Sequence, residues 1–409
     1  MRRTGCINRV LKGHGFSRAA NEARKPGLQP LRDVFDCFQS IYATCSRPGS
    51  FLLLAAGIAL AAGTVAGVAQ GAGAQAPAPN KGISKGVVVK ADEAARRVDI
   101  AIDGKPFTSY IWPVNLKKPV LYPLVDAGGV TVTRGWPLEP RPGERTDHPH
   151  HDGLWFNYGN ANGFDFWNNS EAIKPENREK MGTVVFDRIV SAKSGLHAGE
   201  LTTESTWITG KGDKILAETT TYVFSERNGV RSIDVTATLK ALDKVVFNDD
   251  KEGMLGMRVA RWLESPEEKG GTFTDANGVA TTVAATAEIP GVAPPTGEYL
   301  TSEGVRGGKV WATRGRWCVL TGHTGDHVDS IAIFDHPRNP GYPTYWHARG
   351  YGLFAANPLG RSIFDPKQPP FKYAIEKGES ATFRYRVEIA PRALDASELN
   401  KGADAFAAK

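Results

Sequence analysis

Histidine gathers in two short segments of this chain that also hold tryptophan, asparagine and arginine. Five of the nine histidines lie there. The five are His148, His150, His151, His336 and His347. Imidazole titrates near neutral pH, exchanges protons and binds metals. The two segments are therefore the first candidates for a catalytic site, and the alternative is that single histidines are buried hydrogen-bonding groups.

Spacing in the first segment bears on metal binding. If the segment is extended, His148 and His150 share one face and His151 faces the other way, while Pro149 restricts the segment to a sheet edge or a loop. A pair of histidines on one face could bind zinc, copper or iron with His336 or His347 as a third ligand. The chain has no HExxH motif. The sequence therefore requires no cofactor, and a transition metal stays an alternative.

A carboxylate is needed to complete acid–base chemistry, because such catalysis uses one proton donor and one proton acceptor. Glu252, in a glycine-rich connector, is the candidate acceptor. The default alternative is that this connector is only a solvated loop. His148 or His151 is the candidate proton donor. Arg258 follows in an apolar stretch, where a charge needs a partner or a ligand.

Residues that could hold a ligand surround these histidines. Tryptophan rings stack on the apolar faces of sugars, and arginine and amide groups hold oxygens. The candidate ligand-binding residues are Arg134, Trp155, Asn162, Asp165, Trp167, Arg258, Asn339, Trp346, Arg349 and Tyr351. Oxygen ligands at 160, 162 and 165 could also hold calcium, but the Asn-Gly pair at 162–163 favours a simple turn.

Charge is unevenly distributed along the chain. The 409 residues carry a formal net charge of +6. Residues 1–50 hold nine Lys/Arg and three Asp/Glu, and residues 51–80 hold no charged side chain, so the remainder is formally neutral. Basicity therefore gives no argument for nucleic acid or anionic lipid as a partner. P-loop and GxGxxG signatures are missing as well.

The first 76 residues are typical of an export signal. An apolar, alanine-rich run at 51–69 follows a basic flank, and Ala72-Gly73-Ala74 fits a cleavage site. We expect residues 1–76 to be a long leader, residues 77–409 to be one domain, and the protein to be periplasmic or secreted. The alternative is an uncleaved segment that anchors the chain in a membrane. Three of the four cysteines lie in this leader, so disulfides are not expected in the domain.

Short alternating runs separated by Gly, Pro, Asn and Asp fill the rest of the chain, and such runs predict half-buried strands. The predicted strands are at 86–90, 97–101, 183–186, 219–224, 232–239, 317–320, 330–334 and 382–389. One terminal helix is predicted within 393–408. Many antiparallel strands must stack or close to cover their edges. The sequence therefore predicts an all-β fold, a large antiparallel β-sandwich with a short C-terminal helix.

Four motifs of this chain point to one family: the histidine motif at 147–155, the Asn-Gly-Phe-Asp-Phe-Trp run at 162–167, and the motifs at 336–340 and 346–351. In these motifs the chain resembles a bacterial family labelled PmoA-like. The resemblance covers nearly all of the chain after the leader. It implies an exported protein from a family treated as a domain of unknown function, and it transfers no established active site.

Three functions are compatible with these residues. The first is a carbohydrate-active enzyme, an epimerase, hydrolase or lyase, with its site in a cleft of a β-sandwich that could resemble the aldose mutarotase supersandwich. The second is a non-catalytic glycan-binding module, which needs the tryptophans but no acid and base. The third is a histidine-ligated oxygenase. The expected partner is a small molecule or an oligosaccharide.

Overall fold

The computed structural model describes residues 85–266, 270–274, 279–283, 289 and 291–409. The predicted leader at 1–76 lies outside the described residues. Within the part of the chain that is described, no helix combines the length and the hydropathy needed to cross a bilayer.

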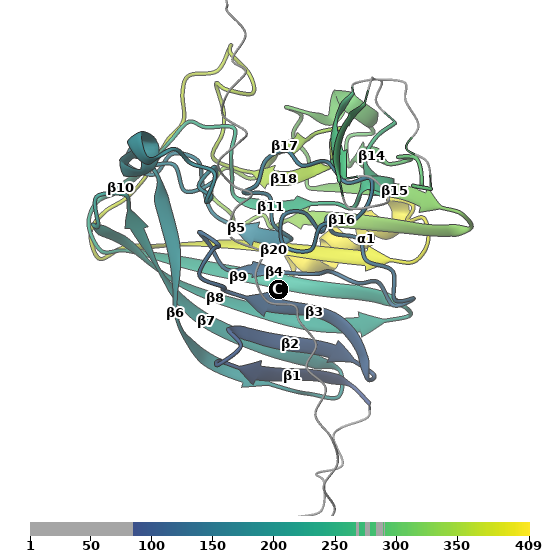
Figure 1. Cartoon of the computed structure of the whole chain (residues 1–409). Helices are drawn as coiled ribbons and strands as arrows, with labels where there is room; N and C mark the ends of the chain where they lie inside the picture. Colours follow the sequence, from purple (N-terminus) through teal and green to yellow (C-terminus); the bar gives the residue numbers. More distant parts are fainter. Residues whose placement is uncertain (1–84, 267–269, 275–278, 284–288, 290) are drawn as a thin grey trace, which may run out of the picture. The chain divides into compact units, whose positions relative to one another are not determined.

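Two eight-stranded antiparallel sheets dominate the described structure (Figure 1). The first sheet has the order β1-β2-β3-β4-β5-β11-β18-β17. Its strands are β1 Val87–Asp92, β2 Arg97–Ile102, β3 Lys105–Ile111, β4 Val120–Leu121, β5 Leu154–Phe156, β11 Leu255–Arg258, β17 Tyr345–Ala348 and β18 Leu353–Asn357.

The second sheet has the order β14-β15-β16-β20-β9-β8-β7-β6. Its strands are β6 Gly182–Lys193, β7 Ala198–Thr209, β8 Lys214–Arg227, β9 Val230–Ala241, β14 Glu298–Thr301, β15 Trp317–Thr324, β16 His327–Asp335 and β20 Ser380–Ala390. Two small two-stranded sheets complete the strands. One pairs β10 Val245–Asn248 with β19 Lys372–Ile375, and the other pairs β12 Gly271–Thr274 with β13 Ala280–Val283.

One apolar core lies between the two sheets, because every second residue of each strand points into it. In β9 buried residues alternate with partly exposed ones, and Ile233, Val235, Ala237 and Leu239 all join the core. On the first sheet Leu154 contributes to the same core. The predicted antiparallel β-sandwich is confirmed.

The predicted terminal helix is also confirmed, as α1 Ala396–Ala407. Asp395 caps its first turn by accepting a hydrogen bond from the Glu398 amide. Leu399, Ala403 and Phe406 form its buried stripe and pack on the outer face of the second sheet. This helix therefore covers the side of the second sheet that faces away from the core.

The outer face of the first sheet carries a second, smaller cluster that includes Trp155 and Trp167. The residues on either side of Trp155 in β5 and of Gly256 in β11 belong to the main core. Because side chains alternate along a strand, Trp155 and Gly256 face outward. Strand register places Trp155, Gly256, Ala355 and His347 side by side in one row. Two small residues thus separate a tryptophan from a histidine on this face.

Replacing Gly256 by Ala tests how tightly this face is packed. A Cβ at Gly256 would lie 2.4 Å from a ring atom of Trp167 and 2.7 Å from one of Trp155. We expect Gly256→Ala to lower the free energy of unfolding by about 1–3 kcal/mol in urea denaturation. Gly308→Ala is the matched control, because a Cβ there meets nothing within 4 Å. Equal stability of the two variants would contradict the described packing.

Candidate functional site

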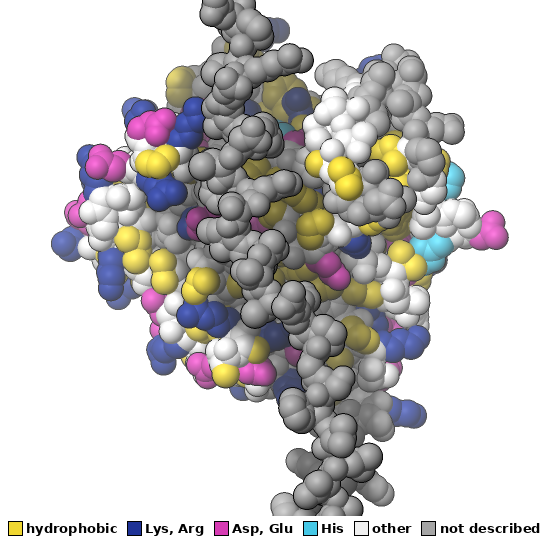
Figure 2. Space-filling view, viewed as in Figure 1, with side chains coloured by type: hydrophobic (Ala, Val, Ile, Leu, Met, Phe, Trp, Pro, Cys, Tyr) yellow, Lys and Arg dark blue, Asp and Glu magenta, His cyan; other side chains and the backbone are white. Residues whose placement is uncertain are grey.

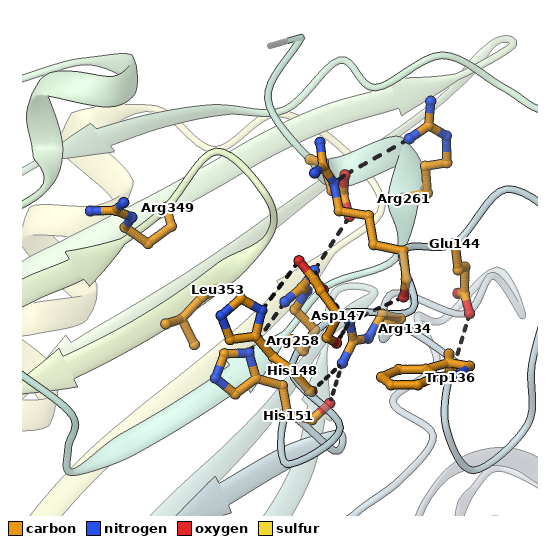
Figure 3. Close-up of polar contacts among 12 residues, drawn as sticks. Arg134, Trp136, Glu144, Asp147, His148, His151, Arg258, Arg261, Arg349 and Leu353 are labelled. Atoms are coloured by element: carbon orange, nitrogen blue, oxygen red, sulfur yellow. Dashed lines mark hydrogen bonds and ion pairs between the residues drawn. The ribbon is translucent and has the colours of Figure 1, made fainter. Parts of the chain in front are cut away.

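The site forms on the outer face of the first sheet and depends on one carboxylate that two buried guanidinium groups share. Asp147 Oδ1 accepts hydrogen bonds from Arg134 Nη1 at 2.9 Å and from Arg258 Nη2 at 2.8 Å (Figure 3). Both arginine side chains are fully buried, and Asp147 is about one-third exposed. Burial raises the pKa of Asp147, but His148 and the two arginines lower it more, so that it lies well below its usual range. Asp147 is therefore a permanent anion.

Arg134 also fixes the loop that holds the histidines. Its guanidinium donates to the carbonyl oxygens of Arg145, Asp147, His148 and His151. Arg134 was expected to hold ligand oxygens, but these bonds commit it to the backbone of the histidine loop. Arg134 is therefore a positioning residue.

The histidine loop is a turn rather than an extended segment. The amide of His151 donates to the carbonyl of His148, and His148 has a φ of 47°. The expectation that His148 and His150 share one face, with His151 opposite, is wrong for this reason. The turn instead stacks the ring of His148 on that of His151, with centroids 4.8 Å apart.

Four rings form one stack across the site. Tyr351 lies 5.0 Å from His148, and His151 lies 5.3 Å from Trp155, measured between ring centroids, with interplanar angles of 7° and 19°. Tyr351 follows β17, whereas the histidines precede β5, so the stack joins segments about two hundred residues apart. It fixes the plane of each imidazole.

Hydrogen bonding sets the tautomers of two buried histidines. His151 Nδ1 faces Arg258 Nη1 at 3.2 Å, and because a guanidinium only donates, the His151 proton is on Nε2. His347 Nδ1 lies 2.9 Å from the carbonyl of Lys251 and must donate to it, which leaves its Nε2 as an acceptor. Burial, with nearby cations, lowers the pKa of His347 to about 3 and that of His151 well below its ordinary value. Both rings are therefore neutral at pH 7.

His148 has a different environment. Its side chain is 39% exposed, and its Nδ1 lies 3.2 Å from Asp147 Oδ2. A carboxylate beside one ring nitrogen orients the imidazole and leaves the other nitrogen for a ligand. Of the three histidines in the turn, His148 is thus the best placed to donate a proton to a ligand.

Glu252 lies at the opposite end of the row, beside His347. Its Oε2 is 3.4 Å from His347 Nδ1, and Lys251 forms an ion pair with Oε1. Oε2 is buried and has no hydrogen-bond partner among the described residues. Glu252 thus lies beside a histidine, as the sequence predicted.

The neighbouring Asp250 feels the charge of Glu252. Burial, together with the charges of Glu252 and Asp165, raises the pKa of Asp250 to about 6, although the hydrogen bond that Asp250 accepts from the Glu252 amide lowers it.

Several buried polar atoms on this face lack a partner within the described residues. They are Trp155 Nε1, Trp167 Nε1, His150 Nε2, Asp152 Oδ1 and Glu252 Oε2. Most buried polar groups in proteins are hydrogen-bonded to protein or water. This set offers donors and acceptors to water or to a polyhydroxylated ligand.

Lys118 is a site residue that the sequence analysis missed. Its side chain is fully buried, donates to the carbonyl of His150 at 2.6 Å, and lies 3.7 Å from Asp152 Oδ2 and 5.2 Å from the ring of Trp155. Burial lowers its pKa. Nothing in the local sequence Lys-Lys-Pro marks this lysine as buried. Asp147 could have been found, because it directly precedes the first histidine.

Other predicted site residues lie elsewhere or have local structural roles. His336 packs edge-on against Phe406 of α1, at the outer face of the second sheet. Asn339 bonds to Asp335 and to the backbone of β20. Trp346 is part of the main core, because it alternates with His347. None of these three joins the site.

The remaining predicted residues lie at its margins. Asn162 has a φ of 54° and bonds to the backbone at Lys244 and Val246, as expected for a turn. Asp165 accepts from the amides of Trp167 and Asn168, and burial raises its pKa. Arg349 points away from His148 and His151 (Figure 3).

The predicted metal set is not assembled. His150 lies edge-on to His148 with ring centroids 5.6 Å apart, and His347 uses Nδ1 on a backbone carbonyl. Within the described residues these three histidines do not gather their nitrogens around one point. The histidine-ligated oxygenase alternative therefore has no support from this geometry.

Replacing Asp147 tests the shared carboxylate. Asp147→Asn removes the charge that compensates two buried guanidinium groups, and we expect a loss of about 2–3 kcal/mol in the free energy of unfolding, reduced by the partial exposure of Asp147. Glu204→Gln is the control, since it breaks an exposed ion pair with Arg188 and should cost less than about 1 kcal/mol. Urea denaturation at pH 7 measures both, and similar losses would contradict the role of Asp147.

Acid titration tests the neutral state of His347. Its folded pKa of about 3 lies below the value near 6.5 of an unfolded histidine, so the unfolded chain takes up the proton first. Its contribution to stability is complete above pH 6.5 and decreases as the pH falls towards 3. As the pH falls from 6 to 4, we expect the free energy of unfolding of His347→Gln to rise relative to that of the parent protein by about 1 kcal/mol per pH unit. The difference in the free energy of unfolding between variant and parent at pH 8 is the reference. If this difference did not change with pH, the neutral state of His347 would be refuted.

Comparison with known proteins gives a family and distant structural neighbours. No curated protein matches the chain. A GH36 alpha-galactosidase from Geobacillus stearothermophilus is 12% identical, with a TM-score of 0.36, over 76% of this chain and 42% of that chain. A galactose mutarotase-like protein from Clostridium acetobutylicum is 10% identical, with a TM-score of 0.36, over 75% and 98% of the two chains. A putative aldose 1-epimerase from Escherichia coli is 9% identical, with a TM-score of 0.28, over 75% and 99%.

This chain thus spans less than half of the galactosidase. With TM-scores this low, the sandwich architecture stands on the strand pairing of the chain itself. The family model that matches covers residues 97–404 and describes a family of unknown function. The expectation of a PmoA-like family is wrong, because the matching model is a different one. The chain belongs to the family of unknown function DUF6807.

Proposed function

We propose that this protein is a carbohydrate-active enzyme of the epimerase, hydrolase or lyase type, working by acid–base catalysis at the outer face of the first sheet. One observation carries the proposal. A histidine paired with a carboxylate, His148 with Asp147, lies on the same face as the buried carboxylate Glu252, whose Oε2 is unpartnered within the described residues. The two groups come from segments about one hundred residues apart in the sequence.

Each group has one role in the proposal. His148 donates a proton to a ligand oxygen, and Asp147 orients its imidazole. Glu252 accepts a proton through Oε2, with Lys251 holding its other oxygen. His151 is neutral and its Nδ1 is occupied by Arg258, so it offers its Nε2–H as a hydrogen-bond donor rather than as an acid.

Electrostatics favours an uncharged ligand. The buried cations at the site are already paired: Arg134 and Arg258 with Asp147, and Lys118 with Asp152. A phosphate or carboxylate on a ligand would have to compete with these anions. On the surface visible in Figure 2, basic and acidic side chains are interspersed rather than gathered by sign. A neutral polyhydroxylated molecule fits best.

The alternative of a glycan-binding module would need tryptophans exposed as a platform. Trp155 and Trp167 are 2% and 0% exposed, so neither presents an open ring face to a polymer. The acid–base groups beside them favour the enzyme. We also propose that the enzyme is exported to the periplasm or the medium. The support for export is the apolar run at 51–69 alone.

A substrate panel tests the proposal. The full chain is incubated with free aldoses, aryl glycosides and uronic-acid polysaccharides, and NMR reports anomeric exchange, released sugar or new double bonds. We expect Glu252→Gln and His148→Gln to lower kcat on the substrate found by about 100-fold or more. His197→Gln, an exposed residue in the turn between β6 and β7, is the control.

Two results would reject the enzyme. Full turnover in both variants would show that other groups do the chemistry. Saturable sugar binding by calorimetry, with no chemical change in any member of the panel, would instead support the binding module.

A further inference from the structure

A second polar cluster lies away from the candidate active site, between the two sheets. Asp126, His327 and Asp329 bring their ligand-type atoms within 4.8 Å of one another. His327 Nε2 is 3.3 Å from Asp126 Oδ2 and 3.0 Å from Asp329 Oδ2. Both carboxylates are fully buried, while the His327 side chain is 27% exposed. We propose that these three residues bind a divalent transition-metal ion, with Zn²⁺ and Mn²⁺ as the candidates.

The fold brings the three side chains together from different layers. His327 and Asp329 alternate along β16, and Ile331 and Ile333 continue the same row into the core of the sandwich. Asp126 lies in the connection that follows β4 of the first sheet. Its backbone and its Oδ1 bond to Val130, which fixes its Oδ2 towards the cluster.

The distances fit a shared ion. Ligand atoms that bind one ion at about 2.0–2.2 Å lie roughly 2.9–3.6 Å apart in tetrahedral or octahedral geometry. The two nitrogen–oxygen distances at the cluster, 3.3 and 3.0 Å, lie in this range. Two carboxylates and one imidazole are a donor set that suits Zn²⁺ and Mn²⁺.

Unpartnered oxygens are an independent observation. Asp126 Oδ2 and Asp329 Oδ1 are buried and have no hydrogen-bond partner among the described residues. Two close, buried carboxylates need positive charge nearby. A divalent ion would supply two positive charges and so balance both carboxylates. A protonated imidazole at His327 would supply only one.

The exposed edge of His327 gives the ion a route from solvent. Trp262 packs edge-on to the imidazole, with ring centroids 6.2 Å apart, and limits its movement. Because the ligands come from both layers, the bound ion would connect the first sheet to the second. Binding should therefore stabilise the whole domain, since an ion that binds only the folded state shifts unfolding to higher temperature.

Calorimetry and thermal unfolding test the site. The full chain, purified without a histidine tag and treated with chelator, is titrated separately with Zn²⁺ and Mn²⁺. We expect one equivalent of at least one of these ions to bind per chain and to raise Tm. Asp329→Asn and His327→Ala should weaken this binding by about 100-fold or more. His323→Ala, an exposed histidine on the neighbouring β15, should bind as the parent does.

The metal-free proteins give a second measurement. Asp329→Asn removes one of two repelling carboxylates, so we expect its Tm without metal to equal or exceed that of the parent, while the metal-dependent rise in Tm disappears. The proposal would be overturned if the parent bound no stoichiometric metal, or if Asp329→Asn and His327→Ala bound the metal as tightly as the parent does. A lower metal-free Tm of Asp329→Asn with no metal effect in the parent would instead identify a protonated imidazole between two carboxylates.

Discussion

The contact on which the candidate site depends is the carboxylate of Asp147 between two buried guanidinium groups. Burying a cation is costly unless an anion compensates it, and here one anion serves two. Arg134 also donates from its two Nη atoms to carbonyls of the turn, and Arg258 Nη1 faces His151 Nδ1. The conformation of the histidine turn and the tautomer of His151 therefore depend on the two guanidinium groups that Asp147 compensates.

The sandwich could be predicted because strand alternation is a local property. Each half-buried strand shows its period of two in the sequence, and β9 matches its predicted range closely. Alternation does not say which face is the core, however. Trp346 and His347 must point in opposite directions, but only the completed sheet places Trp346 in the core and His347 at the site.

The site was harder to predict because its contacts are not periodic. The left-handed backbone at His148 converts an apparent strand into a turn, and this exchanges the neighbours of all three histidines. Lys118 becomes a buried cation only because the histidine turn covers it. Glu252 was found from residue type alone, since a carboxylate was needed to accompany a histidine, whereas the cluster at Asp126, His327 and Asp329 had no signal in local spacing.

The row of Trp155, Gly256, Ala355 and His347 shares its backbone with the main core. Every residue of the row has neighbours, one position away along its strand, that belong to the interior of the sandwich. A slip of one residue would exchange the two faces, so these strands cannot shift without melting the domain. The floor of the site consequently opens only when the whole domain unfolds.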